Sequence, residues 1–269
     1  MLKLKKNLYG QKQAARVWNE HLKTGLFKIG FTPSKIDECL FYRDNVIFMN
    51  YVDDGIFCSP NNEAIDAVIQ ELRGLKFDIE DKGSIGDYLG INFEYNEDGS
   101  IKLSQPHLIE DILKQTHIAE RHLAKTTPAM SSKILHRHEQ EESFNNRFHY
   151  RSVVGKLNYL DKGTRPDISY AAHQCARHSQ DPKKSHGEAI LHHAKYLKGT
   201  KDKGLILKPN PNRSIEVHVD ADFLWKLQSK YIIRRYFYSK VKNWLCYIIC
   251  RMSSDLGFKT SNANCFEHN

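Results

Sequence analysis

The adjacent carboxylates of Asp53 and Asp54 are the residues of this sequence best suited to chemistry. They follow Tyr51 and Val52, and apolar segments flank the four residues on both sides. Two close carboxylates raise one another's pKa unless a cation neutralises them, and hard oxygen ligands at a rigid turn suit magnesium. Two such ions, about 3.5–4 Å apart, can hold a nucleoside triphosphate and activate a primer hydroxyl for in-line attack. The alternative is that the pair supplies only turn chemistry to a solvated hairpin.

The pattern around this acid pair predicts a hairpin with helices before and after it. Apolar residues at three- and four-residue steps predict helices over 11–29 and 63–74. Between them, Asp53 and Asp54 are expected to form the turn of the hairpin. Apolar runs bounded by turn residues predict strands at 40–42, 46–52 and 55–59.

Further along the chain, the pattern predicts a second hairpin and then a group of helices. The hairpin joins 88–95 to 101–104, and Pro106 opens a helix directly after it. A polar stretch over 120–146 is typical of a linker, and 215–219 alternates as a strand. Three more helices are predicted at 148–160, 167–180 and 185–198. This order of elements favours an α+β fold with a helical appendage.

Composition adds less than the motifs do. The chain has 269 residues and a formal net charge of +8, of which +6 falls between Leu224 and the C-terminus. The rest of the chain is only mildly basic, so charge carries little weight as a sign of a nucleic-acid partner. No run approaches the roughly 18 apolar residues of a membrane span, so no membrane partner is expected. The six Cys include no CxxC pair, which argues against a zinc ribbon and a disulfide framework.

Several segments, in one order along the chain, resemble the reverse transcriptase of copia-type LTR retrotransposons. The first, LYGQKQAARVW, is similar to the LYGLKQAPRAW block of that family, with Gln11 and Ala15 as departures, and the second is YVDD. Later segments read YLGI, YRSVVG, TRPDI, YLKGT and DADF. These matching blocks occupy residues 8–18, 51–54, 88–91, 150–155, 164–168, 196–200 and 220–223.

The resemblance implies a function and a set of roles. Asp53 and Asp54 would be catalytic carboxylates and metal ligands of a polymerase palm that holds two magnesium ions. Lys12, Gln13 and Tyr51 would lie beside the nucleotide and the template. The partners would be an RNA template, a DNA primer and deoxynucleoside triphosphates. The parent element would act inside the cell, in the cytoplasm, within a virus-like particle.

The same resemblance implies that two catalytic sets are incomplete in these 269 residues. The family has a further catalytic aspartate upstream of the LYG block, on its own strand, and no Asp precedes Asp37 here. We therefore expect that this polypeptide alone does not polymerise DNA. Asp220 would be the first carboxylate of a ribonuclease H domain, but the resemblance stops after Phe223. The basic segment that follows is interpreted as translation of an altered frame or a gene-model junction.

The expected organisation combines these interpretations. The predicted parts are a partial reverse transcriptase palm (1–118), a linker (119–147), thumb and connection helices (148–212), a truncated ribonuclease H start (213–223) and a basic tail (224–269). Two alternatives to a polymerase fragment stay open. One is a non-catalytic remnant that binds nucleic acid, and the other is a non-functional translation product whose partial palm leaves sheet edges uncovered.

Overall fold

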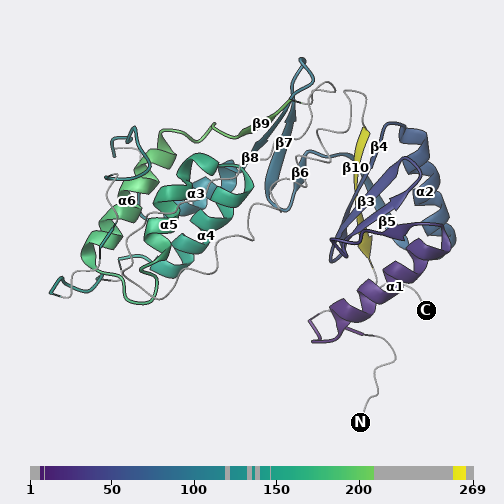
Figure 1. Ribbon diagram of the computed structural model, residues 1–269, viewed down its shortest axis with the longest axis horizontal. Coiled ribbons are helices and arrows are strands. Elements are labelled where there is room, and N and C mark those ends of the chain that lie inside the picture. The colour runs from purple at the N-terminus through teal and green to yellow at the C-terminus, as the bar shows by residue number, and fades with distance from the viewer. Residues whose placement is uncertain are drawn as a thin grey trace, which may run out of the picture. The chain divides into compact units, whose positions relative to one another are not determined.

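The computed structural model describes residues 7–8, 10–118, 122–131, 135–136, 140–145, 147–208 and 257–264, the last of these through their backbone. Two compact units divide the described chain after Gly86. The first unit contains the residues up to Gly86 together with strand β10 (Gly257–Asn264), and the second contains 87–208. Figure 1 labels the elements of both units.

The first unit is an antiparallel sheet that carries two helices. Its strands follow the order β1-β2-β3-β4-β10-β5. The helices are α1 (Ala14–Lys28) and α2 (Asn62–Gly74). The remaining strands are β1 (Thr32–Pro33), β2 (Leu40–Arg43), β3 (Val46–Tyr51), β4 (Asp54–Ser59) and β5 (Asp78–Ser84).

One face of this sheet and the two helices share a core. Alternate residues of β3 point into it, and α2 contributes residues at helical spacing. Gly25 of α1 lies against the ring of Phe77, where a Cβ atom would collide with the ring, so a glycine allows the close approach. Asn61 caps α2 by accepting a hydrogen bond from the Glu63 N–H at 2.8 Å. The core includes Leu22, Leu26, Phe41, Phe48, Phe57, Ile65, Ile69 and Leu72.

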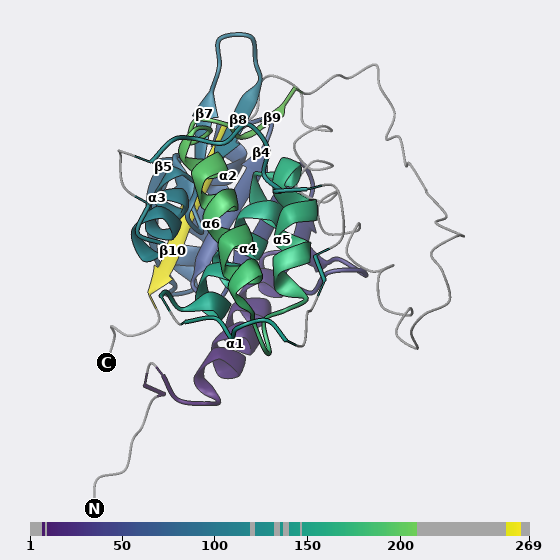
Figure 2. The ribbon, with the colours of Figure 1, turned by 90° about the vertical axis from the view of Figure 1, so that its left-hand side faces the viewer.

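The second unit combines a small antiparallel sheet with a helical cluster. The sheet follows the order β6 (Asp87–Tyr88), β7 (Ile91–Tyr95), β8 (Ile101–Ser104) and β9 (Leu205–Leu207). The helices are α3 (Pro106–Gln115), α4 (Tyr150–Gly163), a 3-10 turn at Pro166–Ile168, α5 (Ser169–Ala176) and α6 (Lys184–Lys198). Figure 2 shows α4, α5 and α6 side by side. The core that the helices of this unit share includes Ile109, Ile112, Val153, Leu157, Leu160 and Ile190.

The α+β class and most of the predicted elements are confirmed, and two of the turns differ from the prediction. The hairpin turn consists of Val52 and Asp53, because Asp54 already belongs to β4 and pairs with Tyr51. The segment 88–95 is not one strand. Leu89 and Gly90 have φ values of +52° and +72° and form a turn that separates β6 from β7.

The compact units and the predicted domains divide the chain at different points. The hairpin of β7 and β8 and helix α3 belong with the later helices, whereas the sequence placed them in a domain over 1–118. The predicted boundaries therefore stay a prediction. The strand predicted at 215–219 lies outside the described residues, and of the tail over 224–269 only β10 is described. None of the helices in the described ranges is both long and apolar enough to cross a membrane.

Candidate metal site at the Asp53–Asp54 hairpin

A two-residue turn presents the acid pair at the end of the β3–β4 hairpin. Tyr51 and Asp54 are paired across the ladder, which leaves Val52 and Asp53 as the turn residues. Val52 has a φ of +57°, in the left-handed region that a β-branched residue rarely adopts. Such a conformation costs on the order of 1–3 kcal/mol and persists only where neighbouring contacts impose it.

Trp18 supplies one of these contacts from helix α1. Its indole Nε1–H donates a hydrogen bond of 2.6 Å to the carbonyl oxygen of Val52. The indole ring also lies edge-on to the ring of Phe77, with 6.2 Å between the centroids. The segment over 8–18 therefore positions the turn of the YVDD segment, although the two are far apart in the sequence. The sequence placed Trp18 in the predicted helix over 11–29 and in the matching block over 8–18, but it did not predict this contact.

The electrostatic environment of the turn is that of two acids and a nearby base. Burial raises the pKa of the Asp54 carboxyl, and the negative charge of Asp53 raises this pKa further. Lys82 of β5 acts in the opposite direction, but the net pKa of Asp54 stays above its ordinary value. Both carboxylates are half-buried. A cation at the turn would stabilise the ionised form of both side chains.

The two carboxylates at the turn are ligands of the kind that a divalent cation prefers, but they are too few to hold two cations. Carboxylate oxygens at a rigid turn are the ligands that magnesium prefers. Among the residues that the structure describes, no group of three or more His, Cys, Asp or Glu side chains could hold a metal ion. Two bridged ions need more negative ligands than Asp53 and Asp54 supply. The two-ion arrangement expected for the family is therefore not met by the described residues.

The other residues predicted for the site lie at the surface of the first unit or outside the described chain. Lys12 and Gln13 are exposed, and Gln13 precedes the first turn of α1 without capping it through its side chain. Tyr51 ends β3 with 57% of its surface exposed. Asp220 lies outside the described residues. Contacts of Lys12, Gln13 and Tyr51 with a nucleotide or a template stay predictions.

A second polar cluster joins two of the sequence blocks within the second unit. Arg165 is 1% exposed and binds the carboxylate of Asp167 through Nε at 2.8 Å and Nη2 at 2.9 Å. The same guanidinium donates to the carbonyl oxygen of Thr200 at 2.8 Å and to its Oγ1 at 2.9 Å. The Tyr196 hydroxyl donates to Asp167 at 2.7 Å. These bonds join the segment that leads into α5 to the end of α6, so the TRPDI and YLKGT segments form one structural unit.

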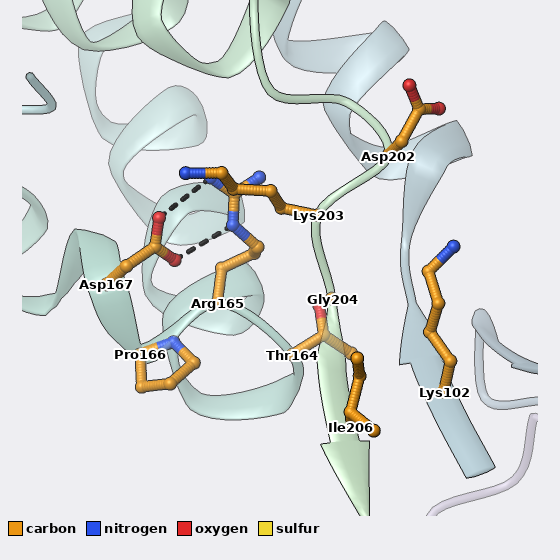
Figure 3. Close-up of a pocket in the computed structure, with 9 residues that line it drawn as sticks. All are labelled: Lys102, Thr164, Arg165, Pro166, Asp167, Asp202, Lys203, Gly204 and Ile206. Atoms are coloured by element: carbon orange, nitrogen blue, oxygen red, sulfur yellow. Dashed lines mark hydrogen bonds and ion pairs between the residues drawn. The ribbon is translucent and has the colours of Figure 1, made fainter. Parts of the chain in front are cut away.

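The Arg165 cluster borders a cavity of about 420 Å³. Charges of both signs line it, with Lys102, Lys203 and Asp202 around the Arg165–Asp167 pair (Figure 3). Although burial acts to raise the pKa of Asp167, the hydrogen bonds from Arg165 and Tyr196 outweigh this effect and hold the pKa below its ordinary value. The guanidinium is thus already neutralised within the fold, which indicates a structural role for Arg165.

Comparison with known proteins gives one consistent family. Residues 1–131 match the family described as "Reverse transcriptase (RNA-dependent DNA polymerase)". The putative transposon Ty5-1 protein of Saccharomyces cerevisiae is 31% identical over 218 residues, which cover 80% of this chain and 70% of that protein. The retrovirus-related Pol polyprotein from transposon RE2 of Arabidopsis thaliana is 31% identical over 226 residues. The Pol polyprotein from transposon RE1 of the same plant is 32% identical over 226 residues.

The hairpin with paired acids, together with these similarities, assigns the chain to the class of reverse transcriptase domains. The chain belongs to the reverse transcriptase family of copia-type retrotransposon Pol polyproteins. The matched region covers 82% of this chain but only 15% of the length of the RE1 and RE2 polyproteins. The chain therefore corresponds to a part of such proteins. No solved structure matches the chain significantly.

Proposed function

We propose that this chain is the part of an RNA-directed DNA polymerase that carries the YVDD hairpin and the helical unit after it. The parent enzyme would join deoxynucleoside triphosphates to a DNA primer along an RNA template. The observation that carries this proposal is the two-residue turn at Val52 and Asp53, which presents both carboxylates in a chain of the reverse transcriptase family. The exposure of Lys12, Gln13 and Tyr51 supports the proposal that they contact nucleotide and template.

The carboxylates of Asp53 and Asp54 would serve as ligands of a divalent cation, with two magnesium ions in the intact enzyme. Magnesium would supply charge neutralisation at the transferring phosphoryl group and would lower the pKa of the primer hydroxyl. Trp18 would keep the turn in the strained conformation that presents the carboxylates, through its hydrogen bond to the Val52 carbonyl. From the same family membership, we propose that the parent element is active in a cytoplasmic virus-like particle. We also assign Asp220 to the ribonuclease H part of that element.

Residues 1–269 alone are proposed to be inactive as a polymerase. The described residues offer two carboxylates at the turn and no group of three or more side chains that could hold a metal ion. The sequence also has no Asp before Asp37. The loss of one group that stabilises transition-state charge costs several kcal/mol of barrier, about 2.7–4 kcal/mol for a single oxyanion-hole donor.

Primer extension on poly(rA)/oligo(dT) tests this proposal. We expect no template-dependent incorporation by the 269-residue chain with either magnesium or manganese. Incorporation that Asp53→Asn abolishes would show that the chain is an active polymerase and would contradict the proposed inactivity.

Cation binding tests the ligand assignment independently of turnover. Manganese titration, followed by electron paramagnetic resonance, should show weak binding by the wild-type chain that is lost in Asp53→Asn. The matched control is Asp44→Asn, since Asp44 is an exposed acid at the β2–β3 turn of the same unit. Equal binding by the Asp53→Asn and wild-type chains would remove Asp53 from the site.

A further inference from the structure

A strap in the second unit runs along helix α6 in the opposite direction to the helix. We define the strap as the described residues 122–131, 135–136 and 140–145, which fall within the segment predicted to be a linker. Near its start, the N–H of Lys125 donates to the carbonyl oxygen of Lys195, in the last turn of α6, at 3.3 Å. Near its end, the carbonyl oxygen of Glu142 accepts from the N–H of Lys184, the first residue of α6, at 3.0 Å. The strap therefore follows α6 from its last turn to its first.

Side chains of α5 and α6, and one just after α5, hold the main chain of the strap. Gln174 of α5 accepts a hydrogen bond from the N–H of Leu135 at 3.1 Å. His178, which follows α5, donates through Nε2 to the carbonyl oxygen of Leu135 at 2.9 Å. In the second half of α6, Nε2 of His192 donates to the carbonyl oxygen of Thr127 at 3.0 Å. The position of the strap therefore depends on polar side chains that satisfy its main-chain groups.

His186 is the residue at which the strap, the start of α6 and the end of α5 meet. Its Nδ1 accepts from the N–H of Lys183 at 2.9 Å, and its Nε2 lies 3.1 Å from the carbonyl oxygen of His136 in the strap. An N–H only donates and a carbonyl only accepts, so Nδ1 carries no proton and Nε2 carries one. The ring of His178 stacks on this imidazole, with 3.8 Å between the centroids and 17° between the planes. The buried ring is therefore neutral, with both nitrogens in use.

The first turn of α6 is also capped by the strap. The carboxylate of Glu141 accepts from both the N–H of Ser185, at 2.5 Å, and the hydroxyl of Ser185, at 2.8 Å. The ring of Phe144 lies against Gly187, where a Cβ atom would collide with the ring. The first N–H groups of a helix have no partner within the helix, so they need partners from outside it. Loss of the strap would remove those partners from α6.

A second proton on His186 is incompatible with these contacts. Nδ1 would become a donor that faces another donor, the N–H of Lys183, so the hydrogen bond at the start of α6 would be lost. The new positive charge would also lie in a fully buried ring, where desolvation disfavours it. Histidine is the side chain whose charge ordinarily changes between about pH 5 and 8. Acid should therefore loosen the strap and the first turn of α6 together.

The charged groups on the elements that contact His186 leave such a charge uncompensated. Lys183 pairs with Asp181 and Lys184 pairs with Glu142, each at 3.3 Å. Within the described ranges, no carboxylate forms an ion pair with His186. The other titratable or charged groups on these elements are His136 and Glu141 of the strap, Glu188 of α6, and His173, Arg177 and His178 at the end of α5.

We propose that His186 is a pH-sensitive latch. While its ring is neutral, it holds the strap to the first turn of α6, and protonation of the ring releases both. The latch acts within the second unit and does not depend on the proposed polymerase function.

Hydrogen exchange of the full chain, followed by NMR, tests the latch. The readout is the protection factor of each amide, which corrects for the intrinsic pH dependence of exchange. Between about pH 7.5 and about pH 5, protection of the Lys183 and Phe144 amides should fall about tenfold or more relative to the amide of Leu157 in the core of α4. In His186→Asn, the side-chain oxygen still accepts from the Lys183 N–H but does not titrate, so the ratio should be the same at both pH values.

Two variants serve as controls. His192 also bonds the strap but does not cap α6, so His192→Asn should keep the wild-type fall in protection. His193→Leu removes another buried imidazole of α6 and should keep it as well. Loss of the fall in either variant would move the acid response away from His186 and would overturn the latch.

The wild-type chain alone provides a second test, which does not require that His186→Asn folds. The ¹⁵N chemical shifts of the His186 ring should change from neutral to protonated values over the same pH range in which protection falls. A ring that stays neutral while the strap loosens would overturn the proposal. So would an unchanged protection ratio in the wild-type chain, or a His186→Asn chain that keeps the fall.

Discussion

At the scale of single residues, the acid pair depends on a hydrogen bond that lies outside the hairpin. Trp18 holds the carbonyl of Val52, and Val52 adopts a φ of +57° that a β-branched residue rarely takes. The turn is therefore imposed by its surroundings as well as by its own sequence. The YVDD motif alone does not predict this dependence, because the donor, Trp18, lies in a helix 34 residues earlier.

Replacing Trp18 with Phe should loosen the turn. Phe keeps an aromatic ring against Phe77 but cannot donate to the Val52 carbonyl, so we expect the free energy of unfolding of the first unit to fall by about 1 kcal/mol. Urea denaturation measures the change, and hydrogen exchange should localise it to residues 51–54. Val17→Ala, at an exposed position of the same helix, should stay within about 0.5 kcal/mol of wild type. A Trp18→Phe chain as stable as wild type would show that the bond does not support the turn.

His193 should make the second unit sensitive to acid. Burial lowers the pKa of this imidazole to about 3, with Arg165 and His192 lowering it further and Asp167 opposing them. Neither ring nitrogen has a hydrogen-bond partner within the described part of the chain. The unfolded chain takes up a proton near pH 6.5 and the folded chain does so only near pH 3, so stability is full above pH 6.5 and is lost as the pH falls.

The replacement His193→Leu should flatten this pH dependence. Between pH 6 and pH 4 we expect the fall in unfolding free energy to shrink by up to about 1.4 kcal/mol per pH unit, measured by urea denaturation at several pH values. The exposed His107→Leu is the matched control and should keep the wild-type slope. An unchanged slope in His193→Leu would contradict a buried neutral imidazole.

At the scale of elements, local periodicity was enough for the helices and for the first hairpin. Apolar residues of α2 recur on one face, and those of β3 alternate, so each signal lies within a dozen residues. Within the turn, Asp54 was misplaced by one residue, because two consecutive acids satisfy either turn register equally well. These errors are small since the flanking apolar residues constrain the strands on both sides.

Elements that form through contacts between distant parts of the chain could not be predicted from local periodicity. Strand β5 has a single buried residue, Ile79, in seven positions, so its sequence shows no alternation. Strand β10 is polar, and its pairing with β4 depends on residues far along the chain. The TRPDI and YLKGT segments were recognised by resemblance, but the bonds of Arg165 to Thr200 became visible only in the structure.

We expect the Arg165 side chain to contribute more to the stability of the α5–α6 region than any other side chain there. Its removal leaves Asp167 and Thr200 without their partner, so we expect Arg165→Ala to lower the free energy of unfolding of the second unit by about 3–5 kcal/mol. Arg165→Lys should recover little, because an ammonium cannot reproduce the planar fork. Thermal denaturation measures both changes.

The control for this prediction is Arg151→Ala. Arg151 is exposed and donates one hydrogen bond to the Ser179 carbonyl, so its loss should cost about 1 kcal/mol or less. If Arg165→Ala were no more destabilising than Arg151→Ala, the buried cluster would not be what joins the two helices.

At the scale of the whole molecule, two separate cores indicate two units of stability. Leu26 lies fully buried in the core of the first unit and Leu160 in that of the second. Either replacement by Ala should lower the stability of its own unit by about 2–5 kcal/mol, because it removes apolar contacts and leaves a cavity. Hydrogen exchange resolved by segment should show faster exchange in the substituted unit alone. Equal destabilisation of both units by either variant would show a single cooperative fold.

The indole that holds the Val52 carbonyl also gives the acid pair a natural reporter. Of the three tryptophans in the sequence, Trp18 donates directly to the turn that carries the carboxylates. In protein grown with 5-fluorotryptophan, its fluorine resonance is the one that disappears in the Trp18→Phe variant. The chemical shift of that resonance then follows the state of the turn, with no tag added to the chain.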